Sequence, residues 1–391
     1  MQALTQASTY PHACSKIEIL ETHISWVILT GKYAYKIKKP VDFGFLNFTS
    51  LARRKQYCEA ELTLNARSAP DLYLGLIEIN GSSQFPSFNG DGPAFEYAIK
   101  MNQFGKGQLF KELHLTNHLT FAHIDELAEQ VSAFHDEVKS ADKLSEYGTP
   151  FQVYEPMQQN FEQIRELISD REHLNQLEQL EIWTKSTFEC LTPLLLTRKE
   201  KGFIREGHGD LHMGNITLFQ QRVTLFDCIE FNEDFRWIDV ISDIAFLVMD
   251  FEAHDLPHYA NRFLNLYLEH TGDYAGLKVL SFYKAYRAVV RAKIALFNMQ
   301  SPTLSATQKK DFIQQYEHYI NLAESYSALP NRFLLIMNGV SGTGKSTVAL
   351  RLANHMGSIR IRSDVERKRL YGIPSNEHPN SSDAALIYNE N

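Results

Sequence analysis

Two short polar clusters place the strongest constraint on how this chain can fold. Residues 207–219 read GHGDLHMGNITLF, and residues 225–231 read LFDCIEF. Asp210 and Asn215 share one loop, and Asp227 emerges from an apolar strand twelve residues after Asn215. An apolar strand flanks each cluster, so a short hairpin is predicted between them. The fold must therefore bring a loop carboxylate, a loop amide and a strand-end carboxylate into one region.

These three groups match the needs of phosphoryl transfer. In protein kinases, an aspartate is followed five residues later by an asparagine and then, after a hairpin, by a metal-binding aspartate. Asp210 and Asn215 are five residues apart, and Asp227 occupies the third position. We predict that Asp210 orients the acceptor hydroxyl and takes its proton. Asn215 and Asp227 are predicted to hold Mg²⁺ against the phosphates of ATP.

The clusters resemble the aminoglycoside phosphotransferase-like branch of the kinase superfamily. The resemblance rests on HGDLHMGN at 208–215, DCIEF at 227–231 and DVISDIAFL at 239–247, which occur in the order of that branch. It implies a bilobal kinase-like fold and an ATP- and Mg²⁺-dependent activity. It also implies that Asp243, in the third motif, braces the catalytic loop.

One alternative is a metal site of the His-x-Asp-x-His kind, formed by His208, Asp210 and His212. No further histidine cluster lies nearby in the sequence, and such a site leaves Asn215 and Asp227 unexplained. We therefore expect His208 and His212 to support the loop through hydrogen bonds.

A kinase site also requires a strand lysine that pairs with the phosphates and a helical glutamate that positions it. Residues 33–39 read YAYKIKK after a short turn, and Lys36 is the better candidate. Lys38 lies on the same face by strand alternation and is the second candidate. Glu59 and Glu61 point to different sides of the predicted helix, so only one can reach Lys36. We favour Glu61 and leave Glu59 open.

No glycine-rich loop precedes Lys36. The first strand turn reads ETHIS, and the resembling branch also lacks the glycine-rich loop and uses hydroxyls there. Ser25 and Thr22 are the candidates for contacting phosphate, with simple turn residues as the alternative. The strand EYAIKMNQF at 96–104 is predicted as the hinge, where the backbone near Met101 would bond adenine.

The acceptor pocket is expected among the later helices. Lys284, Arg287 and Arg291 form one helical stripe, which suits an anionic substrate or, alternatively, is a solvated charged face. No acidic cluster suited to an aminoglycoside stands out. The predicted substrate is a small hydroxyl compound of unidentified structure, and Arg287 and Arg291 are its candidate contacts.

A second constellation lies near the end of the chain. Residues 339–346, GVSGTGKS, fit the phosphate-binding pattern GxxxxGK[ST]. A buried strand, RFLLIM, is predicted before it and an amphipathic helix after it. The predicted phosphate-binding residues are Gly339, Gly342, Gly344, Lys345, Ser346 and Thr347.

The residues after this motif resemble small-molecule P-loop kinases. SIRIRSDVERKRL at 358–370 predicts a strand, with Asp364 either meeting an acceptor at the strand end or capping a helix. No later strand carries a second acidic motif, so we expect an incomplete P-loop domain. The whole chain resembles a bacterial family that joins an aminoglycoside phosphotransferase-like domain to a P-loop kinase-like ATPase domain.

Composition narrows the function classes. The chain has 391 residues, with 39 basic and 47 acidic side chains and a formal net charge of −8. This balance argues against general binding to nucleic acid or acidic membranes. No stretch reads as a signal peptide or membrane span. The four cysteines are scattered and form no zinc or disulfide pattern, which favours the cytoplasm.

The sequence thus predicts an α+β bilobal kinase-like fold followed by the beginning of an α/β P-loop domain. We expect a small β-rich N-lobe at 1–103, a large helical C-lobe at 104–328 and a partial P-loop domain at 329–391. The predicted function is a small-molecule kinase. The alternative is a nucleotide-binding regulatory or scaffold protein with two ATP sites and little transfer activity. The oligomeric state is left open.

Overall fold

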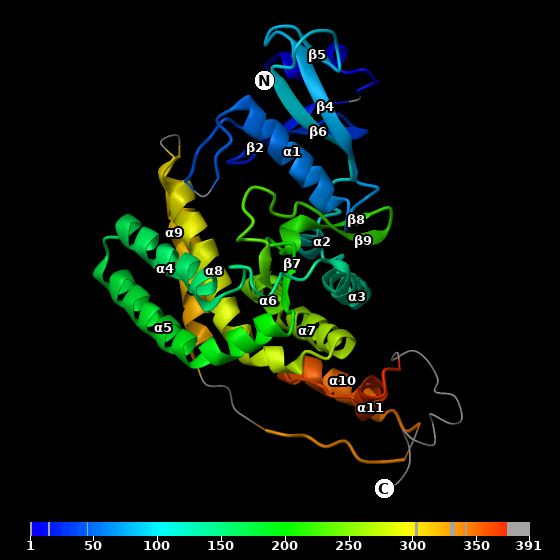
Figure 1. Cartoon of the computed structure of the whole chain (residues 1–391), viewed down its shortest axis with the longest axis vertical. Coiled ribbons are helices and arrows are strands. Elements are labelled where there is room, and N and C mark those ends of the chain that lie inside the picture. Colours follow the sequence, from blue (N-terminus) through cyan, green and yellow to red (C-terminus); the bar gives the residue numbers. More distant parts are fainter. Residues whose placement is uncertain are drawn as a thin grey trace. The chain divides into compact units, whose positions relative to one another are not determined.

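The computed structural model describes residues 2–14, 16–44, 46–301, 304–328, 333–340 and 342–373 (Figure 1). The chain forms two compact units. The first comprises Met1–Leu119, Val138–Ala141 and Arg205–Ile238, and the second comprises Thr120–Glu137, Asp142–Ile204 and Asp239–Asn391. These units divide the chain differently from the predicted lobes at 1–103 and 104–328. The region that holds both polar clusters, 205–238, belongs to the first unit together with the N-terminal sheet.

The first unit is built on one six-stranded sheet with the order β1-β2-β3-β6-β4-β5. All its strand pairs are antiparallel. Two short 3-10 helices, Gln2–Thr5 and Ala7–Thr9, precede the sheet. The strands are β1 (Glu18–Glu21), β2 (Ser25–Leu29), β3 (Tyr33–Lys38), β4 (Tyr73–Gly81), β5 (Pro86–Phe88) and β6 (Glu96–Asn102).

Alternation along β3 assigns its side chains to two different faces. Tyr35 and Ile37 are buried in a cluster with the N-terminal residues Leu4 and Tyr10. Ala34 is buried in the opposite cluster, which includes Cys58 of helix α1 (Leu51–Asn65). Helix α1 begins at its N-cap Ser50, whose hydroxyl accepts a hydrogen bond from Arg53 N–H. Because side chains alternate, Lys36 and Lys38 lie on the same side as Ala34 and face helix α1.

The rest of the first unit carries the predicted catalytic loop. Strands β8 (Ile216–Phe219) and β9 (Arg222–Leu225) form the predicted hairpin, in register from the pair Ile216 and Leu225. Helix α2 (Phe110–Leu115) precedes them in the sequence, and a 3-10 turn, Met213–Asn215, leads into β8. Strands β7 (Ile204–Glu206) and β10 (Trp237–Asp239) pair with each other at the ends of this region.

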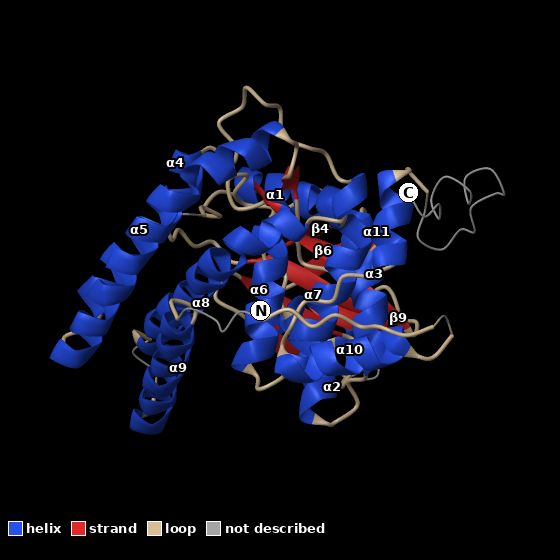
Figure 2. Cartoon of the chain, turned by 90° about the horizontal axis from the view of Figure 1, so that it is seen from below, coloured by secondary structure: helices blue, strands red, loops and turns tan. Residues whose placement is uncertain are grey.

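The second unit is helical (Figure 2). Helix α6 is buried along almost its whole length because most residues of VISDIAFLVMDFEA are apolar and they occur on every side of the helix. It contributes Phe246 and Met249 to a core shared with the neighbouring long helices. The helices are α3 (Phe121–Glu137), α4 (Pro150–Leu167), α5 (Arg171–Glu200), α6 (Val240–Ala253), α7 (Pro257–Thr271), α8 (Leu277–Met299), α9 (Ala306–Ser325), α10 (Lys345–Met356) and α11 (Ser363–Leu370), with a 3-10 turn at Tyr274–Gly276.

Two predicted strands near the C-terminus are absent from the described residues. Residues 333–337, the described part of RFLLIM, belong to no strand or helix, and Leu334 is 83% exposed. Residues 358–362 are likewise not a strand. A strand needs neighbours for its backbone N–H and C=O groups, and none of the described strands pairs with either segment. The prediction of a buried strand before the P-loop is therefore wrong for this structure.

The overall class is confirmed. A β-rich N-terminal sheet is followed by a large helical region, and α10 follows the glycine-rich motif as the start of an α/β P-loop unit requires. Over the described residues, no helix has both the length and the apolar character needed to cross a bilayer.

Candidate active site

The loop that carries Asp210 is held by His208. The ring of His208 is fully buried, and its Nε2 lies 2.9 Å from the carbonyl oxygen of Phe226. Its Nδ1 lies 3.3 Å from the backbone nitrogen of Asp210. A carbonyl can only accept and a backbone N–H can only donate, so the proton of the neutral ring is on Nε2. His208 therefore ties the start of the loop to the end of strand β9.

His212 makes a similar bond further along the loop. Its Nδ1 accepts a hydrogen bond from the backbone N–H of Gly214 at 3.0 Å. The same reasoning places the proton of the neutral ring on Nε2, which lies 3.4 Å from Oδ2 of Asp210. Both histidines thus have the backbone contacts that the predicted supporting role requires.

Asn215 is oriented by Asp210. Its Nδ2 donates to the backbone oxygen of Asp210 at 3.0 Å and to Oδ2 of Asp210 at 2.9 Å. Because the amide nitrogen faces Asp210, the amide oxygen is directed elsewhere and can serve as a ligand for a cation. The five-residue spacing read from the sequence corresponds to this contact.

Gly209 explains why the loop reads HGD. Its φ is +83°, and a Cβ at this position would lie 2.6 Å from the backbone oxygen of Phe235. Only glycine avoids both the strained conformation and the collision. A larger residue would displace the backbone that carries Asp210.

Lys36 links the sheet to the second cluster. Its Nζ lies 2.8 Å from Oε1 of Glu61 and 2.5 Å from Oδ1 of Asp227. The Glu61 side chain is fully buried, whereas 37% of the Asp227 side chain is exposed. The structure thus brings together a strand lysine, a helical glutamate and the strand-end aspartate. Glu59 is exposed on another side of helix α1, 3.9 Å from Lys55.

Lys38 extends this ion-pair network. Its Nζ donates to Oε2 of Glu61 at 2.6 Å and also to a carboxylate oxygen of Glu230. Lys36 and Lys38 are therefore not alternatives, because each bonds one oxygen of Glu61. Sequence reasoning named Lys38 only as a second candidate and assigned no role to Glu230. Two features of the sequence indicated these roles. Lys38 shares a strand face with Lys36, and the acidic residue Glu230 lies three positions after Asp227.

Burial and opposite charge act against each other in this network. Burial lowers the pKa of Lys36, but Asp227 and Glu61 outweigh it and hold that pKa well above its ordinary value. Burial also lowers the pKa of Lys38, and Glu230 and Glu61 reverse the effect. Burial raises the pKa of Glu61, but Lys36 and Lys38 bring it below its ordinary value. For Glu230, burial dominates and raises the pKa. Both lysines and Glu61 are therefore charged at neutral pH.

The described residues fit Mg²⁺ only as a shared site. No group of three or more His, Cys, Asp or Glu side chains within the described ranges is arranged to hold a metal. Mg²⁺ is commonly bound by one or two carboxylates together with substrate phosphates and water. The partly exposed carboxylate of Asp227 and the amide oxygen of Asn215 suit that mode, in which a nucleotide supplies the remaining ligands.

Ser25 and Met101, the residues predicted to contact the phosphate and the adenine of a nucleotide, both lie within the N-terminal sheet. Ser25 lies on β2 opposite Lys38 and is fully buried, and its Oγ has no hydrogen-bond partner among the described atoms. In this conformation its hydroxyl is not accessible to a phosphate. Met101 lies on β6 between Ala34 and Tyr73 and belongs to the cluster beneath helix α1.

Asp243 lies in the second unit on helix α6. Its side chain is fully buried, and Oδ2 lies 3.2 Å from Nε2 of His135. The other ring nitrogen of His135 lies 2.9 Å from the hydroxyl of Tyr267. Asp243 is therefore part of a buried polar chain across helices α3, α6 and α7.

The basic stripe on helix α8 requires a correction. Arg287 is only 6% exposed, and its Nε lies 3.3 Å from the backbone oxygen of Ser242. Lys284 is also buried and forms an ion pair with Glu252 at 2.7 Å. Arg291 lies over the ring of Tyr319, with Cζ 5.6 Å from its centroid. Helix α8 packs against α6 and α9, so the stripe is neither a solvated face nor, at Arg287, an accessible substrate contact.

The described part of the P-loop precedes helix α10. Gly342 and Gly344 each have a φ of +81°, and Gly344 is the N-cap of the helix. Lys345 is the first helical residue, and its Nζ lies 2.6 Å from the backbone oxygen of Val340. Ser346 and Thr347 follow in the first turn, and Gly339 has a φ of +143°.

Asp364 is not a helix cap. The N-cap of α11 is Arg362, and Asp364 lies in the first turn, 3.5 Å from Lys368. Its side chain is 46% exposed. Both predicted roles depended on a preceding strand or a cap position, and neither is observed.

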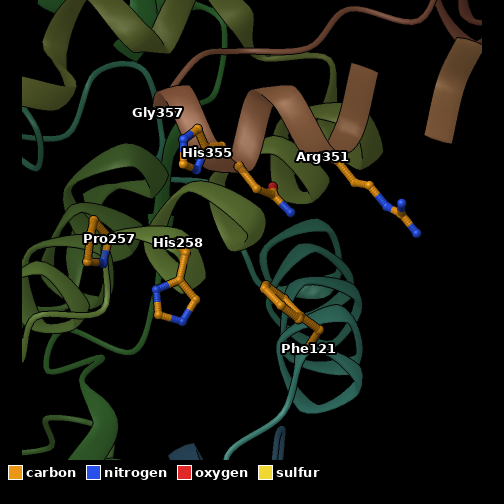
Figure 3. Close-up of a pocket in the computed structure, with 7 residues that line it drawn as sticks. Phe121, Pro257, His258, Arg351, His355 and Gly357 are labelled. Atoms are coloured by element: carbon orange, nitrogen blue, oxygen red, sulfur yellow. The ribbon is translucent and has the colours of Figure 1, made fainter. Parts of the chain in front are cut away.

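A separate cavity of about 470 Å³ lies among helices α3, α7 and α10 in the second unit (Figure 3). None of the predicted site residues lines it. Its lining residues are Phe121, Pro257, His258, Arg351, Asn354, His355 and Gly357.

Comparison with known families separates the chain into the two predicted modules. Residues 102–280 match the Phosphotransferase enzyme family, and residues 334–390 match an AAA domain. The first match includes Asp210, Asn215 and Asp227 but begins after Lys36 and Glu61.

Curated relatives come from mycobacteria. Uncharacterized proteins of Mycobacterium tuberculosis (strain ATCC 25618 / H37Rv) and Mycobacterium bovis (strain ATCC BAA-935 / AF2122/97) are each 29% identical to this chain over 356 residues. Each alignment covers 90% of this chain and 68% of the relative.

Solved kinase structures show a distant likeness. Plasmodium vivax ethanolamine kinase gives a TM-score of 0.48 at 12% identity, covering 81% of this chain and 82% of that chain. The amicoumacin kinase hAmiN gives a TM-score of 0.47 at 13% identity, and the match covers 78% of this chain and 88% of that chain. A likeness at this level carries no inference about substrate. The family matches thus cover two successive segments of the chain: residues 102–280 are similar to the Phosphotransferase enzyme family, and residues 334–390 are similar to an AAA domain.

Proposed function

We propose that the chain is an ATP- and Mg²⁺-dependent phosphotransferase that transfers the γ-phosphate to a hydroxyl of a small molecule. The observation that carries this proposal is the contact between Lys36 and Asp227, with Glu61 bonded to the same ammonium group. These three groups come from a strand, a loop and a helix, and each has a defined task in kinase chemistry.

Each residue has a separate role in this proposal. Asp210 accepts the proton of the acceptor hydroxyl, and His212 and Asn215 hold its carboxylate in place. Asn215 and Asp227 would hold Mg²⁺, which would supply positive charge at the phosphates of ATP. Lys36 stays protonated, and Glu61 keeps its ammonium group at the phosphate-binding position.

A second phosphate site is proposed at the P-loop. Left-handed glycines turn backbone N–H groups toward a phosphate, and the start of helix α10 adds a favourable dipole. Lys345 and Ser346 would contact the phosphates and their metal ion. Two nucleotide sites on one chain are therefore expected.

Nucleotide calorimetry separates the two sites. Asp227→Ala is expected to abolish one binding event and Lys345→Ala the other, so wild type binds two equivalents and each variant binds one. A wild-type stoichiometry of one that Lys345→Ala leaves unchanged would remove the P-loop from the proposal.

A transfer screen tests the activity itself. Purified chain is incubated with Mg²⁺, γ-labelled ATP and a library of small hydroxyl compounds, with Asp210→Asn as the catalytic control. Asp234→Asn, which alters an exposed aspartate of the same unit, is the matched control. We expect at least one labelled product that Asp210→Asn loses by about 10³-fold or more and Asp234→Asn retains. Binding of ATP without transfer to any compound would instead favour the regulatory or scaffold function.

A further inference from the structure

We propose that Tyr73 and Asn65 are positioning residues that hold the backbone at Asp227 and so aim its carboxylate. Neither residue belongs to the motifs that identify the site. The inference rests on the proposed function only in taking Asp227 as the metal-binding carboxylate.

Asp227 has an unusual backbone. Its φ is +65°, in the left-handed region that residues with a Cβ seldom adopt. Such a conformation is strained for a residue with a Cβ and persists where neighbouring groups hold it. We therefore expect neighbouring side chains to form hydrogen bonds with the backbone of the turn that contains Asp227.

Tyr73 supplies the first of these contacts. It lies on strand β4 and is 8% exposed. Its hydroxyl oxygen accepts a hydrogen bond from the backbone N–H of Asp227 at 3.2 Å. Burial, followed by the nearby carboxylates of Glu61 and Asp227, raises the pKa of this phenol, so it stays protonated at neutral pH.

Asn65 supplies the second contact. It is the last residue of helix α1 and is fully buried. Its Oδ1 accepts the backbone N–H of Cys228 at 3.0 Å, and its Nδ2 donates to the backbone oxygen of Glu61 at 2.8 Å. A backbone donor on one side and a backbone acceptor on the other determine which amide atom faces which partner.

Two consecutive amides of the turn are therefore held by two different elements of the first unit. Beyond this turn, the Asp227 carboxylate meets Lys36 at 2.5 Å. Asn65 also donates to the backbone oxygen of Glu61, and the Glu61 side chain bonds Lys36. The amide side chain of Asn65 therefore connects Glu61 with the turn at 227–228. Loss of either contact should let the turn relax and should move the carboxylate away from the metal position.

Tyr73→Phe is the decisive variant, because it removes only the hydroxyl. Tyr35→Phe is its matched control, since Tyr35 is a buried tyrosine whose hydroxyl bonds His12 within the opposite cluster of the same sheet. We expect the Mg²⁺ concentration for half-maximal ADP binding, measured by calorimetry in a Lys345→Ala background that leaves only the Asp227 site, to rise about three- to tenfold in Tyr73→Phe. Tyr35→Phe should bind as wild type does.

A second readout needs no nucleotide. Hydrogen exchange of the segment 223–231 in the ligand-free protein is expected to be at least threefold faster in Tyr73→Phe than in wild type or Tyr35→Phe. Asn65→Leu should have the same effect, and Asn65→Asp, which keeps an acceptor for Cys228 N–H, should have less.

The outcomes distinguish the two proposals. Faster exchange in Tyr73→Phe with no Mg-nucleotide binding by wild type would overturn the proposed function and leave the backbone-holding role supported. Unchanged exchange in Tyr73→Phe together with wild-type Mg²⁺ dependence would overturn the positioning role and leave the proposed function standing.

Discussion

Lys36 and Lys38 project from the same face of strand β3 and bond opposite oxygens of a single carboxylate, that of Glu61. Each lysine then bonds a second acid, Asp227 for Lys36 and Glu230 for Lys38. The two lysines are two residues apart on β3, and the acids Asp227 and Glu230 are three residues apart on one loop. Together with Glu61 of α1 they form a closed network of ion pairs. Lys36, Glu61 and Asp227 belong to the expected kinase set, so Lys38 and Glu230 add a mainly structural pair.

Removing Lys38 should be costly because it leaves Glu230 buried without its cation. Breaking one partner of a buried ion pair costs about 3–5 kcal/mol. We expect Lys38→Met to lower the free energy of unfolding by about 3 kcal/mol in urea titrations. Adding Glu230→Gln to that variant should recover part of the loss, because the buried acid left without its partner is removed.

Lys39→Met is the control for that measurement. Lys39 pairs with Glu21, whose side chain is 64% exposed, and exposed pairs contribute about 0–1 kcal/mol. A loss in Lys38→Met no greater than in Lys39→Met would contradict the network as described. An additive double variant would show that Lys38 and Glu230 are not coupled.

Gly209→Ala should disrupt the loop beneath Asp210. The added Cβ would lie 2.6 Å from the backbone oxygen of Phe235, at a φ of +83° that alanine disfavours. We expect a loss of about 2 kcal/mol or more in unfolding free energy and a large fall in kcat. Gly214→Ala, where the nearest contact is the His212 ring at 2.8 Å, should be milder because a side chain can move. Equal losses in the two variants would argue against backbone strain at Gly209.

Arg287 should behave as a core residue. Its guanidinium bonds Ser242 and lies over the Phe246 ring, with Cζ 5.0 Å from the centroid. We expect Arg287→Ala to lower the unfolding free energy by about 2 kcal/mol and to leave the KM of any acceptor unchanged. Arg291→Ala is the comparison and should cost less, since Arg291 is only partly buried. A raised KM with wild-type stability in Arg287→Ala would restore the substrate-contact prediction.

Lys293 should make stability depend on pH in the alkaline range. Burial lowers its pKa to about 8, and its Nζ contacts the amide oxygens of Asn160 and Gln163 at 2.5 and 3.0 Å. A lysine in the unfolded chain has a pKa of about 10.4, so between these two pKa values the unfolded chain binds more protons than the folded one. The contribution of Lys293 to stability therefore rises with pH from about 8 to about 10.4.

Urea unfolding at a series of pH values between 7 and 10 tests this sign. Lys293→Met should lack the alkaline rise that wild type shows and should be at least as stable at pH 7, because no charge is buried. Lys309→Met, which alters an exposed lysine on helix α9, should keep the wild-type pH dependence. An identical slope in Lys293→Met and wild type would mean that Lys293 keeps an ordinary pKa.

The sequence predicted the elements that depend on local pattern. Alternation placed Lys36 and Lys38 on one face, and the apolar flanks predicted the β8–β9 hairpin. The five-residue spacing of Asp210 and Asn215 predicted a shared loop, and in the structure they are hydrogen-bonded. These features are set by residues close together in the chain, where backbone geometry leaves few alternatives.

Failures occurred where the outcome depends on distant partners. RFLLIM has the composition of a buried strand, but a strand forms only where a neighbour accepts its hydrogen bonds. Arg287 has the spacing of an accessible stripe, but the packing of helices α6 and α9 buries it. The sequence of RFLLIM does not show whether a partner strand is present, and the sequence around Arg287 does not show which helices pack against it.

The sequence by itself thus determined the chemical groups, their order and the local elements that carry them. The tertiary structure decided which groups meet: Glu61 rather than Glu59, both lysines rather than one, and Tyr73 and Asn65 at the backbone of the Asp227 turn. The physical reason is that hydrogen bonds and ion pairs act over about 3–4 Å, whereas these partners are 23 to 163 positions apart along the chain.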